Sequence, residues 1–199
     1  MSRFIESIKL KDGQLFLLSE HEARLNKTRA EVLGLDKPIN LHAALYSFLK
    51  EHPKGLFKIR VLYTFGIDKI EIHPYQQRAI RHLKVVSGNI DYRYKTVDRT
   101  ALHQLYSQRG IYDDVIIIKD NLVTDSYYAN LVFNDGQTWW TPSTPLLKGV
   151  QRAFLLQEKI IKERMIRQEE IPNFKQVKLV NAMMDWVDAP IVAIDNVWT

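Results

Sequence analysis

Two features that could take part in ligand binding or catalysis lie close together in the stretch Asp120–Arg152. Asp125 interrupts an apolar run, and Gly149 opens a long helical pattern. An unpaired buried carboxylate is costly, so Asp125 should have a cationic or hydrogen-bonding partner. A helix N-terminus offers backbone N–H groups and a positive dipole end to an anion. The pair suits a charged, phosphorylated cofactor. The alternatives are that Asp125 is a turn residue and that Gly149 only marks the boundary before a helix.

Two basic residues could complete such a site. Lys95 falls where an extended segment gives way to a predicted helix, and a lysine facing a cleft there could form a Schiff base. Arg24 is a candidate anion ligand on a helix that also carries Lys27 and Arg29. Spacing alone leaves the alternative of solvated basic side chains open for all of them.

Apolar periodicity and turn residues predict the elements that would position these groups. Strands are expected at residues 4–10, 14–18, 56–65, 69–73, 80–86, 113–119, 122–133, 137–141, 177–180 and 191–194. Helices are expected at residues 20–32, 41–50, 95–109 and 150–164, the first opened by an N-cap at Ser19 and a capping box with Glu22. This order predicts an α+β or α/β protein with a small N-terminal α+β domain, residues 1–90, and a C-terminal domain, residues 91–199.

The composition restricts the class of protein. The chain has 199 residues, 46% hydrophobic and 26% charged, which is typical of a soluble globular protein. Without cysteine it can form neither disulfides nor thiolate metal sites, as suits a cytoplasmic protein, and its histidines lack metal-ligand spacing. The net charge of +5 is spread along the chain, so we expect no nucleic-acid partner, and no apolar run is long enough to predict a membrane span.

Several segments resemble the class IV aminotransferase family, the pyridoxal-phosphate enzymes of fold type IV. They follow the family's order: IESIKLKDGQLFLLSEHEARLNKT, YKTVDR, LVTDSYYANLVF, TPSTPLLKGVQR and VNAMMDWVDAPI. The resemblance covers nearly the whole chain. It implies a D-amino acid aminotransferase-like fold with a small N-terminal part and a larger, β-rich C-terminal part. It also implies pyridoxal 5'-phosphate as cofactor and a homodimer.

The resemblance assigns a role to each matching residue. Lys95 would form the Schiff base with the cofactor and shuttle protons, and Asp125, where the family has glutamate, would pair with the pyridine nitrogen. Arg24 would contact the phosphate. The remaining cofactor-binding positions are Leu147 behind the ring, Val150 and Gln151 at the helix start, and Asn181 and Ala182 on the phosphate side.

Two departures bear on activity. Asp125 is one methylene shorter than glutamate, and Gln151 replaces the usual threonine, so the side-chain contact changes while the N–H contact survives. The chain begins where the family's FET motif falls, so we expect it to lack the preceding hairpin segment that helps to build the substrate side. The resemblance favours 4-amino-4-deoxychorismate lyase, which releases pyruvate and 4-aminobenzoate for folate synthesis, because VNAMM is similar to the lyase's late strand. An amino acid transaminase of the branched-chain or D-amino acid type, or a non-catalytic protein on this scaffold, are the alternatives.

Overall fold

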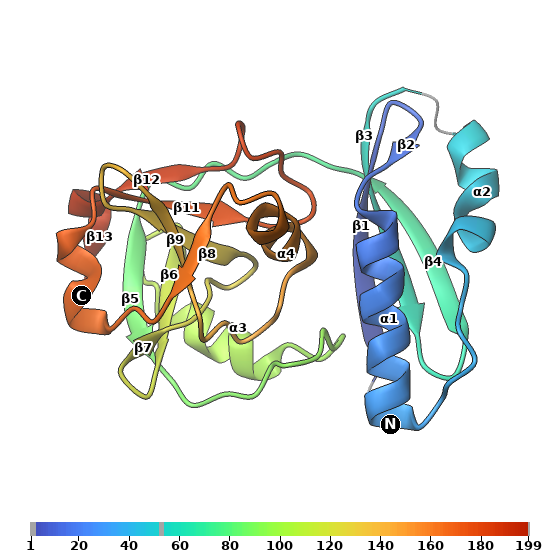
Figure 1. Ribbon diagram of the computed structural model, residues 1–199, viewed down its shortest axis with the longest axis horizontal. Coiled ribbons are helices and arrows are strands. Elements are labelled where there is room, and N and C mark those ends of the chain that lie inside the picture. The colour runs from blue at the N-terminus through green and yellow to red at the C-terminus, as the bar shows by residue number, and fades with distance from the viewer. Residues whose placement is uncertain (1–2, 52–53, 199) are drawn as a thin grey trace. The chain divides into compact units, whose positions relative to one another are not determined.

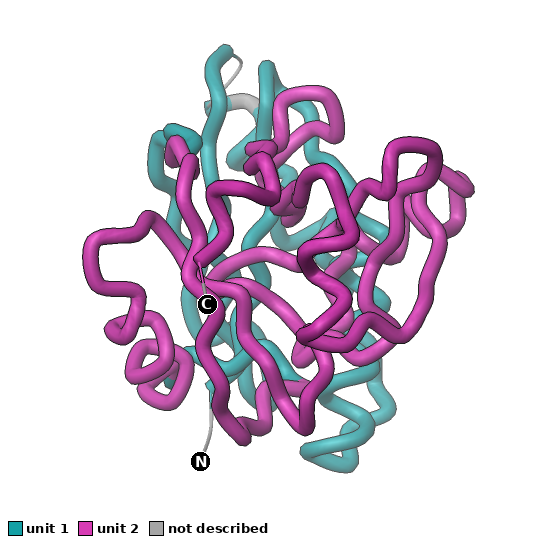
Figure 2. The backbone as a smooth tube through the Cα atoms, turned by 90° about the vertical axis from the view of Figure 1, so that its left-hand side faces the viewer, with its two compact units in different colours: residues 1–77, 94–98 teal, residues 78–93, 99–199 magenta. Residues whose placement is uncertain are grey.

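The computed structural model describes residues 3–51 and 54–198 and divides the chain into two compact units. The first unit comprises Met1–Gln77 and Tyr94–Asp98, and the second Arg78–Arg93 and Arg99–Thr199, as the two colours of Figure 2 show. Each unit therefore takes two separate segments of the sequence. The predicted domain boundary near residue 90 stays a prediction.

The first unit is one antiparallel sheet with two helices on one face (Figure 1). Its strands, in sheet order, are β2 (Gln14–Leu15), β1 (Phe4–Lys11), β3 (Leu56–Tyr63) and β4 (Ile67–Pro74). Its helices are α1 (Leu18–Leu33) and α2 (Leu41–Glu51). Apolar side chains alternate along the strands, so the helix-facing side chains form one core with Leu25, Leu41 and Leu45 of the helices. Gly34 ends α1 in the left-handed conformation.

The second unit has two sheets. One has the order β13 (Val197–Trp198), β5 (Leu83–Ser87), β6 (Asp114–Lys119) and β7 (Leu122–Val123). The other has the order β10 (Lys162–Arg164), β9 (Trp139–Pro142), β8 (Asn130–Asn134), β11 (Gln176–Val180) and β12 (Ile191–Ala193). The helical elements are α3 (Thr100–Ser107), α4 (Val150–Gln157) and the short 3-10 helices η1 (Gln168–Asn173) and η2 (Ile194–Asn196).

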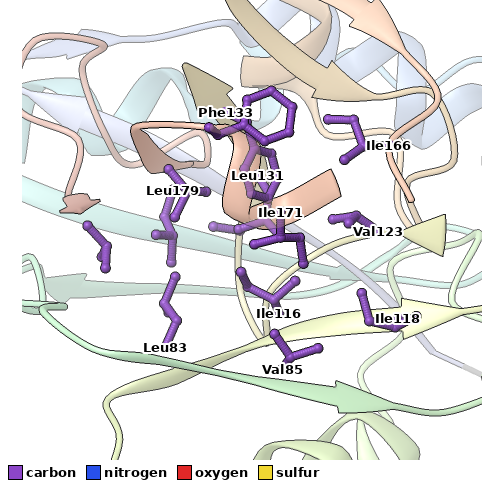
Figure 3. Packing of buried hydrophobic residues seen from close by; sticks show 14 of the residues in the cluster. Leu83, Val85, Ile116, Ile118, Val123, Leu131, Phe133, Ile166, Ile171 and Leu179 are labelled. Atoms are coloured by element: carbon purple, nitrogen blue, oxygen red, sulfur yellow. The ribbon is translucent and has the colours of Figure 1, made fainter. Parts of the chain in front are cut away.

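The two sheets pack face to face. Leu83 and Ile116 of the first sheet meet Leu131, Phe133 and Leu179 of the second in one buried cluster, shown as sticks in Figure 3. The outer face of the β5–β6 sheet packs on α3, and that of the β8–β11 sheet packs on α4. Since both sheets are covered on both faces, β6 and β8 contain uninterrupted apolar runs.

Several predicted elements are shorter than expected, and three differences affect the candidate site. Residues 122–133 do not form one strand: β7 ends at Val123, because the Ser126 hydroxyl accepts the N–H groups of Tyr128 and Ala129 and turns the chain before β8. α3 begins at Thr100 rather than Lys95, because Lys95 O accepts a hydrogen bond from Ile5 N in an extended segment.

The third difference is in the helix after Gly149. It ends at Gln157 rather than residue 164, because Lys159 adopts a positive φ of 58° and the chain then enters β10. The predicted N-cap at Ser19 is also wrong: Leu17 is the N-cap of α1, and the Ser19 hydroxyl bonds to Glu20 instead. The remaining strand ends differ from prediction by up to three residues, at 14–18, 56–65, 69–73, 80–86, 113–119, 137–141, 177–180 and 191–194.

Truncation of Leu131 tests the core of the second unit. Leu131→Ala should lower the free energy of unfolding by about 2–5 kcal/mol, because it removes a fully buried side chain and leaves a cavity. Ile111→Ala is the control, since Ile111 is 95% exposed, and it should change the value by no more than about 0.5 kcal/mol. Chemical denaturation measures both, and equal effects would contradict the packing.

Candidate functional site

In the first unit, the predicted anion ligand Arg24 is held by a buried acid. Glu6, on the helix-facing side of β1, is completely buried, and Arg24 Nε donates to Glu6 Oε1 over 2.9 Å. Arg24 Nη2 donates to Glu6 Oε2, so the guanidinium binds the carboxylate with two hydrogen bonds. Arg24 is only 16% exposed, so the alternative of a freely solvated basic side chain is wrong for this residue.

His21 completes this cluster. Its Nδ1 lies 2.6 Å from Glu6 Oε2, and Nε2 has no hydrogen-bond partner among the described residues. Burial is the main cause of the lowered pKa of His21, and the charges of Arg24 and Lys95 lower it further. The imidazole is therefore neutral at pH 7, with Nδ1–H donating to the carboxylate. Burial raises the pKa of Glu6, but Arg24 and His21 outweigh it and lower that pKa to about 2.

Lys95 also belongs to the first unit. Its segment forms an antiparallel bridge with β1 through Phe4 and Thr96, and Lys95 is half-buried. The backbone of the candidate Schiff-base lysine is thus fixed by hydrogen bonds to the strand that carries Glu6.

In the second unit, Asp125 lies where the sequence predicted a buried carboxylate. It follows β7, is 5% exposed, and accepts hydrogen bonds from Leu147 N over 2.9 Å and Asn130 Nδ2 over 2.7 Å. Burial raises the pKa of Asp125 to about 7, although these bonds and the charge of Arg152 lower it. Two neutral donors do not compensate a buried charge, so a cationic ligand group beside Asp125 would be favourable.

Asn130 organises the backbone around Asp125. Its Nδ2 also donates to Leu147 O over 2.8 Å, which joins the start of β8 to the loop before α4. A Cβ atom at Gly149 would lie 2.1 Å from Asn130 Oδ1, so only glycine lets the helix start approach this closely. Contacts of Asn130 therefore join the Asp125 loop to the N-terminus of α4.

The other predicted positions surround this structure within the second unit. Val150 and Gln151 are the first two residues of α4 and are buried, while Gly149 has no side chain to cap the first N–H groups of that helix. Asn181 Nδ2 donates to Tyr128 O over 3.3 Å, so it lies against the Asp125 loop, and Ala182 follows it in a turn. Leu147 is half-buried and contacts Asp125 through its backbone.

Sequence reasoning missed four residues of these clusters. Glu6 carries a signal that could have been used, because it is a lone acid at a core-facing position of an alternating strand. His21 is three residues before Arg24 and shares its helix face. Asn130 and Arg152 carry no comparable signal, since their importance comes from contacts with the loops around Leu147 and Pro142.

The chain belongs to the class IV amino-transferase family, whose sequence profile matches residues 3–192. An uncharacterized Haemophilus influenzae protein is 36% identical over 186 residues, which cover 92% of this chain and 98% of that protein. A crystal structure described as a proposed 4-amino-4-deoxychorismate lyase from Haemophilus somnus is 34% identical, with a TM-score of 0.86. The match covers 92% of this chain and 97% of that chain.

A more distant structure has the same fold. The PLP-bound form of a hypothetical aminotransferase from Mycobacterium tuberculosis is 17% identical, with a TM-score of 0.76 over 96% of this chain and 80% of its own. These findings confirm the predicted family, the fold class and a pyridoxal-phosphate-dependent enzyme. The roles of the individual residues toward the cofactor stay predictions. Within the described residues no helix is long and apolar enough to cross a membrane.

Substitution of Glu6 tests the buried ion pair. Glu6→Gln keeps the shape but leaves Arg24 without its counter-charge, so the free energy of unfolding at pH 7 should fall by roughly 3–5 kcal/mol. Because the pKa of Glu6 is lowered, its stabilisation is complete above about pH 4.5 and is lost as the pH falls toward 2, where the two proteins should converge. Glu31→Gln on α1 removes an exposed pair with Lys27 and should cost less than about 1 kcal/mol. A pH-independent difference would contradict this account.

The raised pKa of Asp125 predicts the opposite pH dependence. In cofactor-free protein, folded Asp125 keeps its proton between about pH 4 and 7 while the unfolded chain loses it, so stability should fall as the pH rises through this range. Asp125→Asn lacks this titration, and its stability should fall less between pH 5 and 8. Asp114, whose pKa burial raises to about 6, is present in both proteins and cancels in the comparison. Parallel stability curves would show that Asp125 does not titrate in this way.

Proposed function

We propose that this chain is a 4-amino-4-deoxychorismate lyase, which cleaves its substrate into pyruvate and 4-aminobenzoate in the cytoplasm, as a homodimer and as a step of folate synthesis. The observation that carries the proposal is the 34% identity with the proposed Haemophilus somnus lyase over 97% of that chain. The late segment VNAMM, which contains Asn181 and Ala182, also resembles the lyase's strand.

The residues present fit pyridoxal phosphate. In the first unit, Arg24 would bind the phosphate and Lys95 would attach the cofactor. In the second unit, the N–H groups of Val150 and Gln151, together with Asn181 and Ala182, would bind the phosphate. Leu147 would pack against the ring. Asp125 would pair with the protonated ring nitrogen, which supplies the positive charge that its two neutral donors do not.

The bound cofactor supplies an electron sink for the carbon that bears the substrate amine. Asp125 would keep the ring nitrogen protonated, and Asn130 and Leu147 N hold that carboxylate in place. The Lys95 amine would accept the proton from the amine-bearing carbon and would assist the departure of pyruvate. Glu6 orients the Arg24 guanidinium, which would bind the phosphate of the cofactor.

Pyruvate release tests the proposal. Cofactor-loaded protein should convert 4-amino-4-deoxychorismate into equal amounts of pyruvate and 4-aminobenzoate. Pyruvate is measured with a lactate dehydrogenase assay and 4-aminobenzoate by chromatography. Lys95→Ala should lower the rate by about 10²–10⁴-fold because it removes the proton-transfer group. Absence of pyruvate with fully loaded wild-type protein would overturn the lyase assignment.

The alternative is an amino acid transaminase, the activity for which the matching family is named. A transaminase would convert an added amino acid into its keto acid and leave the amine form of the cofactor. Branched-chain and D-amino acids added singly to the loaded protein, with detection of the keto acid, separate the two reactions. The lyase proposal predicts no stoichiometric keto acid from any of them.

A further inference from the structure

The loop that carries Asp125 is closed at its two ends by Asp125 itself and by Asn130. These two residues form an antiparallel bridge, and the Asn130 amide donates to the Asp125 carboxylate. The backbone O of Asp125 accepts a hydrogen bond from Ile117 N of β6 over 2.9 Å. Residues 126–129 lie between the two ends, and we call them the loop tip. Because the tip is so short, a shift of the tip displaces Asp125 and Asn130.

Two charged side chains hold the backbone of Tyr127 in the loop tip. Asp114, the first residue of β6, accepts the N–H of Tyr127 at Oδ1 over 3.2 Å. Arg99, the residue before α3, donates from Nη2 to the carbonyl oxygen of Tyr127. Both backbone hydrogen-bonding groups of one loop residue are therefore bound by side chains, which lie 13 and 28 residues away in the sequence.

The Tyr127 ring is held by α3 and by Arg99. It stacks on the Tyr106 ring of α3, with the ring centroids 4.2 Å apart and an interplanar angle of 20°. The guanidinium carbon of Arg99 lies 4.2 Å from the centroid of the Tyr127 ring, and the His103 ring meets it edge-on at 6.2 Å. Aromatic stacking and cation–π contacts both favour this arrangement. The side chain and the backbone of Tyr127 are therefore both fixed.

Burial of the Asp114 carboxylate costs free energy. Asp114 is 0% exposed, its Oδ1 also accepts from Val115 N over 2.7 Å, and Oδ2 has no hydrogen-bond partner among the described residues. Burial raises the pKa of Asp114 to about 6, although these N–H groups and the charges of Arg78 and Arg99 lower it. An apolar residue would suit the start of a buried strand better. The contact with Tyr127 N explains why an acid lies here.

We propose that Asp114 and Arg99 are positioning residues, which hold the backbone of Tyr127 so that the Asp125 carboxylate faces the ring nitrogen of the cofactor. They act through the loop tip and not by contact with the cofactor. A binding group must be held within about 0.5 Å of its productive position by residues that support it from outside the site. The inference rests on the cofactor role of Asp125 in the proposed function, and it holds for either reaction, that of a lyase or that of a transaminase.

A cofactor analogue isolates the contact of Asp125. Pyridoxal phosphate and 1-deazapyridoxal phosphate, in which carbon replaces the ring nitrogen, are titrated into cofactor-free protein, and binding is followed by calorimetry. Wild type should bind the natural cofactor at least about tenfold more tightly, because only that cofactor forms a charge-assisted hydrogen bond with Asp125. Asp125→Asn should lose most of this preference. Asp114→Ala and Arg99→Met should each reduce it to less than about threefold, because a released tip lets Asp125 move.

Two further variants separate positioning from a general loss of structure. Asp114→Asn keeps an oxygen acceptor for Tyr127 N, so it should restore the wild-type preference. Asp113→Ala removes the neighbouring acid, whose carboxylate accepts backbone N–H groups outside the Asp125 loop, and it should keep the preference. The melting temperature of each cofactor-free variant shows whether it folds. Arg99→Met carries the test if Asp114→Ala does not fold.

The outcomes keep this inference apart from the proposed function. A wild-type preference in folded Asp114→Ala or Arg99→Met overturns the inference, and so does an equal loss in Asp113→Ala or a failure of Asp114→Asn to restore the preference. No preference in wild type overturns the inference together with the cofactor role of Asp125. The expected pattern of preferences in a protein that releases no pyruvate supports the inference and rejects the lyase.

Discussion

The buried carboxylate of Asp125 is the constraint on which the second unit's site depends. Asp125 lies between β7 and β8 and is only 5% exposed, so its ionisation is costly. Its neighbours are the backbone N–H of Leu147, the side-chain amide of Asn130 and the nearby charge of Arg152. Asn130 connects this acid to Leu147 and, through its contact with Gly149, to the start of α4. The Asp125 loop and the start of α4, to which we assign the ring nitrogen and the phosphate of the cofactor, are thus joined by direct contacts.

The first unit also contains a buried carboxylate, Glu6, but stabilises its charged form with a cation. Glu6 is more deeply buried than Asp125, yet its pKa is lowered rather than raised, because Arg24 and His21 supply charge and hydrogen bonds directly. The helix side of this sheet thereby holds the Arg24 guanidinium in a fixed position.

The sequence allowed the fold class, most of the elements and the acidic residue to be predicted, because apolar periodicity and an acid in an apolar run are local signals. The segment around Lys95 was predicted as helix because its pattern is helical, and only pairing with β1 shows otherwise. Asn130 and Glu6 act through partners 17 and 18 residues away, Leu147 and Arg24, so spacing along the chain does not identify these partners. The roles of Arg24, Gln151 and Ala182 came from family resemblance and not from any local pattern.

The most direct test of the central claim is the absorbance spectrum of purified protein after addition of pyridoxal phosphate, recorded for wild type, Lys95→Ala and Lys69→Ala. The account predicts a protein-bound band, distinct from free cofactor and fixed by borohydride reduction, in wild type and Lys69→Ala. Lys95→Ala should lack the reducible band. A reducible band that persists in Lys95→Ala, or its absence from wild type, would contradict the assignment of Lys95 as the residue that attaches the cofactor.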